Sequence, residues 1–542
     1  MNIPSLFIFK HPNIIFIIIF SSALNNLLIS QNQPISPLIY SYQEHTDLKS
    51  TSPYGLEWIH LGPTLNGARV EAIQSDPNTP GTIYAAFGSG GLWKTINNGL
   101  NWKPIFENMP SLGIGDIALA PSNTEIIYVA TGENLKKARN FTMPGTGVYR
   151  SNNGGDTWEH IGLNDTWHIG EIVVHPNNPD IVLVAAQGHF WSSNENRGIF
   201  RTDDGGKSWN HVLFIDENTG ANDIVFSRAN PKIVYATTWE NYPNVNGKKS
   251  AVYKSEDAGL IWNKITNGVT INKNTGRIGI AASYQDKDKA YIFIDQRNQR
   301  NGQGTGEVYK TTNGGKNWKK THKENIKSLS VIGWYFMDMY VNPQNDEEIY
   351  GLGVRLIHSI DGGKTFKNIG GQITHLTPSP AQTLHLDHCE MWINPSNPKE
   401  LLLGNDGGVY HSYDGGKSWL HLNNISAGEF YDIEIDNQDP YHIYGGTQDD
   451  ATVYGFAQEY NSEFDDPWEY LWIDAWSGGD GCITLVDPND ENTVYFSMQN
   501  GGARRRNINT GKSVDIRPKF QKEDNIKVQY NFITPYMLSH FD

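Results

Sequence analysis

The sequence predicts an all-β fold, a β-propeller built of four-stranded blades. A Ser/Thr-x-Asp/Asn-x-Gly-x-x-Trp/Phe motif occurs seven times in the 542 residues, at steps of 48 to 56 residues. A second motif, a Pro/Asn turn followed by an apolar strand, runs in phase with the first and occurs nine times. The 54 Gly, 16 Trp and 26 Tyr are typical of aromatic strands separated by glycine turns. Repeats near this period indicate propeller blades, each a small antiparallel sheet.

The N-terminal segment differs from the repeats. Residues 1–30 contain a lysine, an apolar run from Ile14 to Phe20 and small residues after it, which is the order of a secretory signal peptide. A membrane anchor is the alternative, but about 20 apolar residues are needed to span a bilayer, and Asn25 and Asn26 interrupt this run. Residues 31–50 then form a polar leader. We expect a secreted, periplasmic or surface protein without an integral membrane segment once the signal is cleaved.

Each blade is expected to consist of a strand, a Pro/Asn turn, a second strand, a loop, a third strand such as "GVYRS", the first motif as a turn, and a last strand. We call that turn the aspartate turn. Its seven copies end at Trp102, Trp158, Trp209, Trp262, Trp318, Phe366 and Trp419. Residues 51–425 are therefore predicted to form a seven-bladed propeller. Residues 426–542, which lack the aspartate turn, are predicted to add blades of a truncated second propeller. One incomplete ten-bladed ring is the alternative.

The acidic or amide side chain of the aspartate turn has a structural explanation. It can accept hydrogen bonds from backbone N–H groups two residues on, the Ser or Thr can add another bond, and Gly supplies a positive φ. A calcium loop of the EF-hand type would need further acids. Asn replaces Asp in three copies and cannot serve as a carboxylate. We therefore interpret as structural the residues Asn97, Asn153, Asp204, Asp257, Asn313, Asp361 and Asp414.

Charge and cysteine content limit the partners and the covalent structure. The formal net charge of -16 disfavours nucleic acid, because phosphate binding needs clusters of Lys and Arg. Cys389 and Cys482 occupy the same repeat position two blades apart, a separation too large for a disulfide. We predict two free, buried thiols, and we expect a monomer.

Acids in the loops directly after the second strand of each blade are candidate ligand-binding groups. Such loops converge on one face of a propeller near its axis, where acids could bind sugar hydroxyls, cationic peptide groups or Ca²⁺. Solvated turn acids are the alternative. The candidates are Glu133, Asp295, Asp406, Asp449, Asp450 and Asp480. No cofactor is expected, calcium being the one ion that these acids would suit.

Two further stretches carry candidate site residues. In "TLHLDHCEMW", His385 and Asp387 are expected to share one face of a strand, with His388 on the other, and are candidate metal ligands; a polar strand lining the axis is the alternative. In "DDPWEYLWIDAWSGGDG", three tryptophans are candidate platforms for sugar rings, with packing between blades as the alternative. These three are Trp468, Trp472 and Trp476. Trp191, Trp239 and Trp334, elsewhere in the chain, are further candidate platforms.

The aspartate turn is an Asp box, and the chain from about residue 52 resembles the secreted Asp-box (BNR-repeat) propellers. That group includes the sortilin-type receptor domain, a ten-bladed propeller that binds peptides in its tunnel, and sialidases, whose Phe/Tyr-Arg-Ile-Pro motif is missing here. It also includes the xyloglucanase family, which has two tandem propellers and two catalytic aspartates. Where that family has its first catalytic aspartate, the segment "AAFGSGGLWK" of this chain has Gly88. The segment around the family's second catalytic aspartate is similar to "GNDGGVY" with Asp406 or to "GGDGC" with Asp480.

The resemblance implies a secreted recognition module for a polysaccharide or peptide ligand. The alternative is a glycoside hydrolase of xyloglucanase type acting on plant or algal polysaccharide, with Asp406 and Asp480 as candidate catalytic residues. Whether the chain is an enzyme stays open at this point. A hydrolase of the inverting kind needs two opposed carboxylates roughly 6.5–9.5 Å apart.

Overall fold

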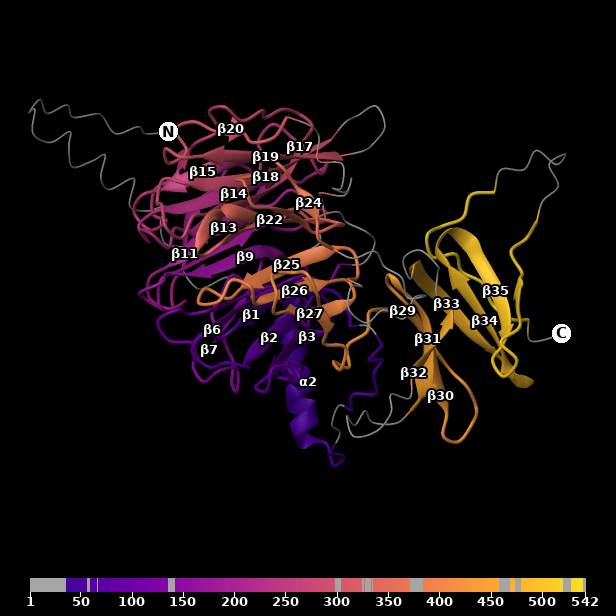
Figure 1. Ribbon diagram of the computed structural model, residues 1–542. Coiled ribbons are helices and arrows are strands. Elements are labelled where there is room, and N and C mark those ends of the chain that lie inside the picture. Colours follow the sequence, from indigo (N-terminus) through magenta and orange to yellow (C-terminus); the bar gives the residue numbers. More distant parts are fainter. Residues whose placement is uncertain are drawn as a thin grey trace, which may run out of the picture.

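Seven four-stranded antiparallel sheets follow one another along the chain (Figure 1). The last of them packs against the first, which closes them into a ring. The computed structural model describes residues 36–55, 59–65, 67–134, 142–297, 304–323, 326, 333, 335–370, 384–457, 468–472, 479–519 and 528–539. In each sheet the strands pair in chain order, as the repeat predicts. The predicted all-β propeller of seven blades is therefore confirmed. The predicted signal peptide lies outside the described residues.

The bounds of the strands follow the repeat. The first two blades contain β1 (Val70–Ser75), β2 (Ile83–Phe87), β3 (Gly91–Thr95), β4 (Lys103–Pro104), β5 (Ile114–Leu119), β6 (Ile127–Thr131), β7 (Val148–Ser151) and β8 (Glu159–His160). The third and fourth contain β9 (Ile169–Val174), β10 (Val182–Ala186), β11 (Gly198–Thr202), β12 (Asn210–Leu213), β13 (Thr219–Phe226), β14 (Val234–Glu240), β15 (Ala251–Ser255) and β16 (Asn263–Lys264). The fifth to seventh contain β17 (Thr275–Ala282), β18 (Ala290–Arg297), β19 (Gly304–Thr311), β20 (Lys319–Lys320), β21 (Asp338–Asn342), β22 (Asn345–Leu352), β23 (Ile357–Ser359), β24 (Lys367–Asn368), β25 (His388–Ile393), β26 (Leu401–Asn405), β27 (Gly408–Ser412) and β28 (Leu420–His421).

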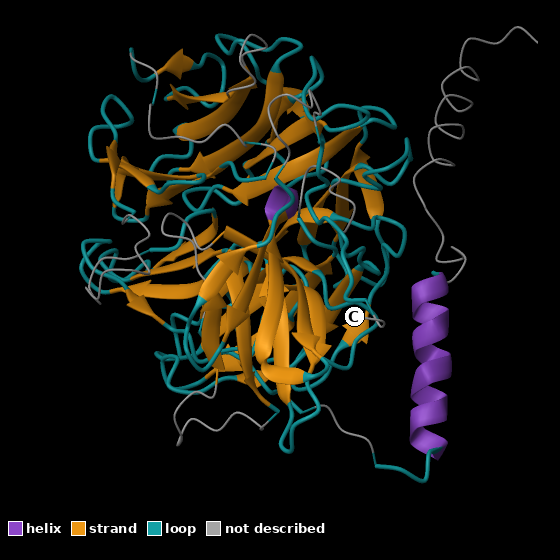
Figure 2. Ribbon diagram, turned by 90° about the vertical axis from the view of Figure 1, so that its right-hand side faces the viewer, coloured by secondary structure: helices purple, strands orange, loops and turns teal. Residues whose placement is uncertain are grey.

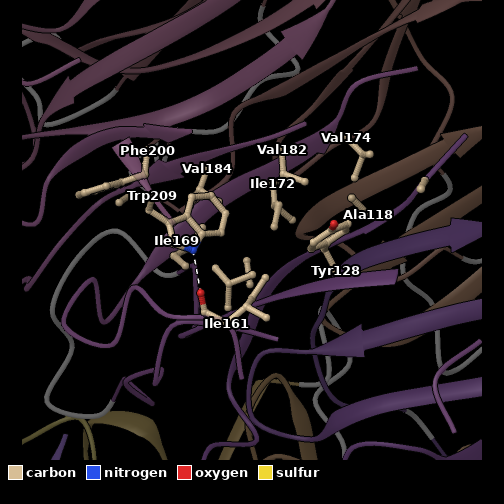
Figure 3. Packing of buried hydrophobic residues seen from close by; sticks show 14 of the residues in the cluster. Ala118, Tyr128, Ile161, Ile169, Ile172, Val174, Val182, Val184, Phe200 and Trp209 are labelled. Carbon is tan, nitrogen blue, oxygen red and sulfur yellow. Dashed lines mark hydrogen bonds between the residues drawn. The ribbon is translucent and has the colours of Figure 1, made fainter. Parts of the chain in front are cut away.

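The core of the ring consists of apolar clusters between neighbouring blades. The second strand of a blade, such as "IYAAF" of β2, is buried along its whole length because a blade covers each of its faces. Figure 3 shows the cluster between the second and third blades, where the Trp209 indole N–H donates to the Ile161 carbonyl over 2.7 Å. Burial of such apolar surface is the main stabilising contribution to this fold.

The ring closes between the seventh and first blades without exchanging a strand. Val70 and Phe87 of the first blade share one apolar cluster with Leu402 and Val409 of the seventh. Two backbone hydrogen bonds accompany this packing, from Gly67 to Gly407 over 3.1 Å and from Ala68 to Ala427 over 2.8 Å. Side-chain packing, rather than a continuous strand ladder, therefore joins the two ends of the ring.

Each aspartate turn contains the same hydrogen bonds. In the third blade, Thr202 Oγ1 donates to Asp204 Oδ1 over 2.7 Å, and the N–H of Gly206 donates to Thr202 Oγ1 over 2.9 Å. The N–H of Ser208 donates to Asp204 Oδ1 over 3.0 Å. In all seven copies the first bond measures 2.6–3.0 Å and the second 2.9–3.0 Å, whether the acceptor is Asp or Asn. These bonds fix the turn without a metal ion.

A further sheet follows the ring, which we call the C-terminal sheet. Its strands are β29 (Phe430–Ile435), β30 (His442–Thr447), β31 (Asp450–Phe456), β32 (Trp468–Trp472), β33 (Gly479–Asp487), β34 (Asp490–Met498), β35 (Gly502–Asn507) and β36 (Ser513–Asp515), with the 3-10 turn η1 (Gln499–Gly501) before β35. The first four and the last four strands are joined by the parallel pairing of β31 with β33. That this sheet belongs to a second propeller remains a prediction.

The helix α2 (Pro37–Thr51) precedes the ring and buries none of its residues. Figure 2 shows it standing beside the strands. Among the residues that the structure describes, no helix is long and apolar enough to cross a bilayer.

Candidate functional site

An arginine at the start of the first blade gathers carboxylates from three parts of the chain. Arg69 is 1% exposed; its Nε lies 3.0 Å from Glu71, and its NH2 lies 2.8 Å from Glu133 of the second blade. The same NH2 lies 2.6 Å from Glu429, which immediately precedes the C-terminal sheet. We call these four residues the Arg69 cluster. It ties the first two blades of the ring to the C-terminal sheet.

One guanidinium cannot neutralise three glutamates. Burial lowers the pKa of Arg69, but the surrounding carboxylates outweigh it and raise that pKa well above its ordinary value. Burial raises the pKa of Glu133 to about 8, although Arg69 opposes this rise. The Glu133 carboxyl is therefore mostly protonated at neutral pH, which relieves the surplus of negative charge.

Three aspartates meet beside this cluster. Asp387 precedes β25, Asp406 follows β26 and Asp449 lies between β30 and β31; one oxygen of each lies within 4.8 Å of the others. Asp406 is 3% exposed, and burial raises its pKa well above the ordinary value, against the lowering effect of Arg69. A buried, protonated carboxyl can donate a proton. Three carboxylates at this spacing are also oxygen ligands of the kind that Ca²⁺ takes.

A chain of side chains links Asp406 to Asp480, the two candidate catalytic residues. The Tyr335 hydroxyl, at 3.4 Å from Asp406 Oδ2, accepts a hydrogen bond of 3.0 Å from Gln448 Nε2. Gln448 Oε1 lies 3.3 Å from the Tyr431 hydroxyl, which lies 2.9 Å from Asp480 Oδ1. The structure thus brings both aspartates to the junction of the ring and the C-terminal sheet, with three side chains between them.

The remaining candidate acids are buried rather than solvated. Asp450, which is 7% exposed, lies 3.5 Å from His385, and Asp480 is 6% exposed. Asp295, which is 1% exposed, belongs to β18 of the fifth blade, where its carboxyl packs against Gly333. The alternative of solvated turn acids is therefore wrong for these residues.

The structure corrects the prediction that His385 and Asp387 lie on one strand. β25 begins at His388, and both candidate ligands lie in the connection before it, where Asp387 has a φ of 67°. Their sharing of one strand face is therefore wrong. His385 pairs with Asp450, so the close group of possible metal ligands contains Asp387 together with Asp406 and Asp449.

The candidate tryptophans have different surroundings. Trp468 is 3% exposed and donates from its indole to the Leu61 carbonyl over 2.6 Å, so it packs the C-terminal sheet against the segment before the ring. Trp239 is fully buried, whereas Trp191 is 52% exposed. Trp334, Trp476 and the side chain of Trp472 lie outside the described residues.

Both cysteines are buried and free, as predicted. Burial raises the pKa of Cys482 to about 12 and that of Cys389 well above its ordinary value. Neither thiol is therefore activated as a nucleophile.

The glycine that departs from the xyloglucanase pattern lies at the Arg69 cluster. A Cβ added at Gly88 would lie 3.3 Å from the Cγ atoms of Glu71 and Glu133 and 3.4 Å from Arg69 Nε. The space that an aspartate would occupy at this position is thus filled by the cluster. Comparison of the repeats could have singled out Arg69 of this cluster, because the residue at the same repeat position in the second blade is Gly113.

Comparison with known proteins agrees with this fold. The family model described as sortilin, neurotensin receptor 3 (Sortilin-Vps10) matches residues 146–347. A xyloglucanase of Paenibacillus sp is 21% identical over 406 residues, covering 70% of this chain and 33% of that protein. A xyloglucanase of Acetivibrio thermocellus is 24% identical over 350 residues, covering 54% of this chain and 40% of that protein. This chain thus spans well under half the length of these relatives.

Among solved structures, the GH74 xyloglucanase from Xanthomonas campestris superposes with a TM-score of 0.54 at 15% identity, over 84% of this chain and 74% of that one. At this identity the likeness concerns the fold. The chain is an all-β protein whose seven-bladed propeller resembles both the sortilin-type receptor domain and the xyloglucanase family.

Proposed function

We propose that the protein is a glycoside hydrolase acting on a xyloglucan-like polysaccharide outside the cytoplasm. The observation that carries the proposal is the buried Asp406, whose pKa is raised and which the Tyr335–Gln448–Tyr431 chain links to Asp480. The likeness to xyloglucanases supports it, and the signal-like N-terminal run supports the location.

In this proposal Asp406 is the general acid. Hydrolysis of a glycosidic bond needs a carboxylic acid that is still protonated near neutral pH and a second, ionised carboxylate. Burial raises the pKa of Asp406, which is the direction that the first condition requires. Asp480 is the second carboxylate, because Asp387 and Asp449, with oxygens within 4.8 Å of Asp406, leave little room for the sugar and the water.

Access to the two aspartates depends on the junction. Asp406 and Asp480 are 3% and 6% exposed, so substrate reaches them only when the C-terminal sheet separates from the ring there. The Glu429–Arg69 and Gln448–Tyr335 contacts would have to yield in that step.

Release of reducing sugar from xyloglucan tests the proposal. The wild type should release it, and Asp406→Asn and Asp480→Asn should each lower the rate roughly a hundredfold or more. Asp361→Asn is the matched control, since three sister aspartate turns carry Asn; it should leave the rate unchanged. Equal rates for the wild type and Asp406→Asn would refute the assignment.

A recognition module is the second candidate. Gly88 stands where the xyloglucanase pattern has its first aspartate, and the sortilin model matches residues 146–347. This candidate predicts saturable binding of polysaccharide or peptide with no release of sugar, in wild type and Asp406→Asn alike.

A further inference from the structure

The turn between β30 and β31 lies against the ring at the candidate site. It consists of Gln448 and Asp449, which follow β30, and of Asp450 and Ala451, which begin β31. We call these four residues the β30–β31 turn. Gln448, Asp450 and Ala451 are buried, whereas connections between strands normally lie at the surface. The C-terminal sheet thus presents a buried turn to the ring.

Two side chains of this turn contact the residues around Asp406. Gln448 Nε2 donates to the Tyr335 hydroxyl over 3.0 Å, and that hydroxyl lies 3.4 Å from Asp406 Oδ2. Asp450 Oδ1 lies 3.5 Å from His385 Nε2. Asp406 itself is buried, and the turn forms its cover on the side of the C-terminal sheet.

The backbone of the turn is strained. Asp449 has a φ of 53° and Ala451 a φ of 65°, in the left-handed region that residues with a Cβ resist. The corresponding turn of the seventh blade, between β26 and β27, ends on a glycine with positive φ, Gly408. Such strain persists only where surrounding contacts impose it, and it is typical of segments that change conformation.

A third carboxyl group adds to this cost. The ring holds Asp387 and Asp406 together through the bond from the Asp406 N–H to the Asp387 carbonyl over 3.3 Å. The turn brings Asp449 to them, so that one oxygen of each lies within 4.8 Å of the others. Ionised carboxyl groups at such distances repel each other. Backbone strain and charge repulsion therefore both oppose the inserted position of the turn.

We propose that the β30–β31 turn is a plug that retracts from Asp406 while the rest of the C-terminal sheet stays on the ring. The hydrogen bond from Gln448 to Tyr335 holds the plug in place against strain and repulsion. The Arg69–Glu429 ion pair holds the sheet itself. Retraction is then the first step of the separation that a substrate requires. That the plug inhibits hydrolysis rests on the proposed function, whereas the covering of Asp406 does not.

Cys389 reports the retraction, because its thiol lies 4.0 Å from Asp406 Oδ1 and is buried with it. The folded protein is treated with an excess of thiol reagent at pH 8, and peptide mass mapping distinguishes Cys389 from Cys482. Tyr335→Phe and Gln448→Ala each remove the hydrogen bond between ring and plug. Both should label Cys389 roughly fivefold faster than the wild type or more. Cys482, whose thiol contacts the Phe532 carbonyl at 3.9 Å, should stay unlabelled.

Trp468→Phe is the matched control. It also removes one hydrogen bond of the C-terminal sheet, the bond of 2.6 Å from the indole to the Leu61 carbonyl, but it leaves the plug unchanged. Cys389 should therefore stay unlabelled in this variant over the time in which Tyr335→Phe becomes labelled.

Asp449→Asn tests the charge repulsion. Asn has the size of Asp and tolerates a positive φ, but it removes the third carboxyl group. Added to Tyr335→Phe, it should slow the labelling of Cys389 roughly threefold. Faster labelling of the double variant would contradict the proposed balance of forces.

Equal labelling of Cys389 in Tyr335→Phe and Trp468→Phe would overturn the proposal, because the sheet would then move as one unit. Unchanged labelling in both Tyr335→Phe and Gln448→Ala would also overturn it and leave a static turn. If Gln448→Ala does not fold, Tyr335→Phe still decides the question. Labelling requires no hydrolysis, whereas Asp406→Asn tests the release of sugar, so the plug and the proposed function can fail independently.

Discussion

Arg69 of the first blade and Glu429, directly before the C-terminal sheet, form an ion pair with 2.6 Å between nitrogen and oxygen, in which the arginine is buried and the glutamate partly buried. The two residues are separated by 360 positions in the chain. The pair joins the ring to the sheet at the place where the candidate aspartates lie.

Arg69→Met should destabilise the protein strongly. Removing the guanidinium leaves the buried Glu71 and the partly buried Glu429 without their counter-charge, and breaking a buried ion pair costs about 3–5 kcal/mol. The loss should be measured by urea unfolding at pH 7. Lys249→Met, at the exposed pair with Asp216, is the control and should cost no more than about 1 kcal/mol. Similar losses for both variants would show that the Arg69 cluster contributes little.

Stability should fall as the pH rises from about 5 to 8. Burial raises the pKa of Glu133 and Asp116 to about 8 and that of Asp223 to about 7. Between the unfolded and folded pKa values, the folded state binds more protons than the unfolded state, so raising the pH favours unfolding. Glu133→Gln should reduce this slope, as measured by urea unfolding at several pH values. A stability that rises over this range would contradict the prediction.

Asp361→Ala should cost roughly 1–2 kcal/mol, because it removes the acceptor of bonds from Ser359 and Thr365. Asp361→Asn should cost less than about 0.5 kcal/mol, since Asn keeps the same acceptor atom. Thermal unfolding of the two variants distinguishes them. If the Asn variant is as unstable as the Ala variant, the carboxylate itself has a role that the turn geometry does not explain.

Neither thiol of the native protein should react with a thiol reagent at pH 8. Cys389 and Cys482 are 7% and 0% exposed, and burial raises the pKa of both, so little thiolate is present or accessible. The final absorbance of the reacted reagent should correspond to no labelled thiol in buffer and to two labelled thiols per chain in guanidinium chloride. Rapid labelling of the native protein would mean that the junction around Cys389 opens readily.

The ring could be predicted from the sequence because its signals are local. Thr202, Asp204 and Gly206 form the bonds of one aspartate turn within five residues. Because the same pattern occurs seven times, its structural role could be inferred from the sequence. The junction could not be predicted in the same way. Comparison of the repeats singles out Arg69 as an exception, but Tyr335, Gln448 and Glu429 are distant from it in the chain, and no periodicity shows that these residues meet.

His385 and Asp387 illustrate a second limit. Alternation along a strand suggested a shared face, but the positive φ of Asp387 breaks the strand before β25. Its backbone conformation depends on contacts with the neighbouring blade, such as the bond from Asp387 N–H to the Val354 carbonyl over 3.1 Å. Such tertiary contacts override local propensity.

The closure of the ring by packing has a mechanical consequence. Force applied across the seam between Val70 and Leu402 loads apolar contacts, the two bonds at Gly67 and Ala68, and the side-chain bonds from Asn424 to the Gly99 and Leu100 carbonyls. Within a blade, the same force would have to shear a ladder of strand hydrogen bonds. Tension across the seam should therefore separate packed surfaces before it breaks the strand ladders, so we expect the propeller to open there while its blades stay intact.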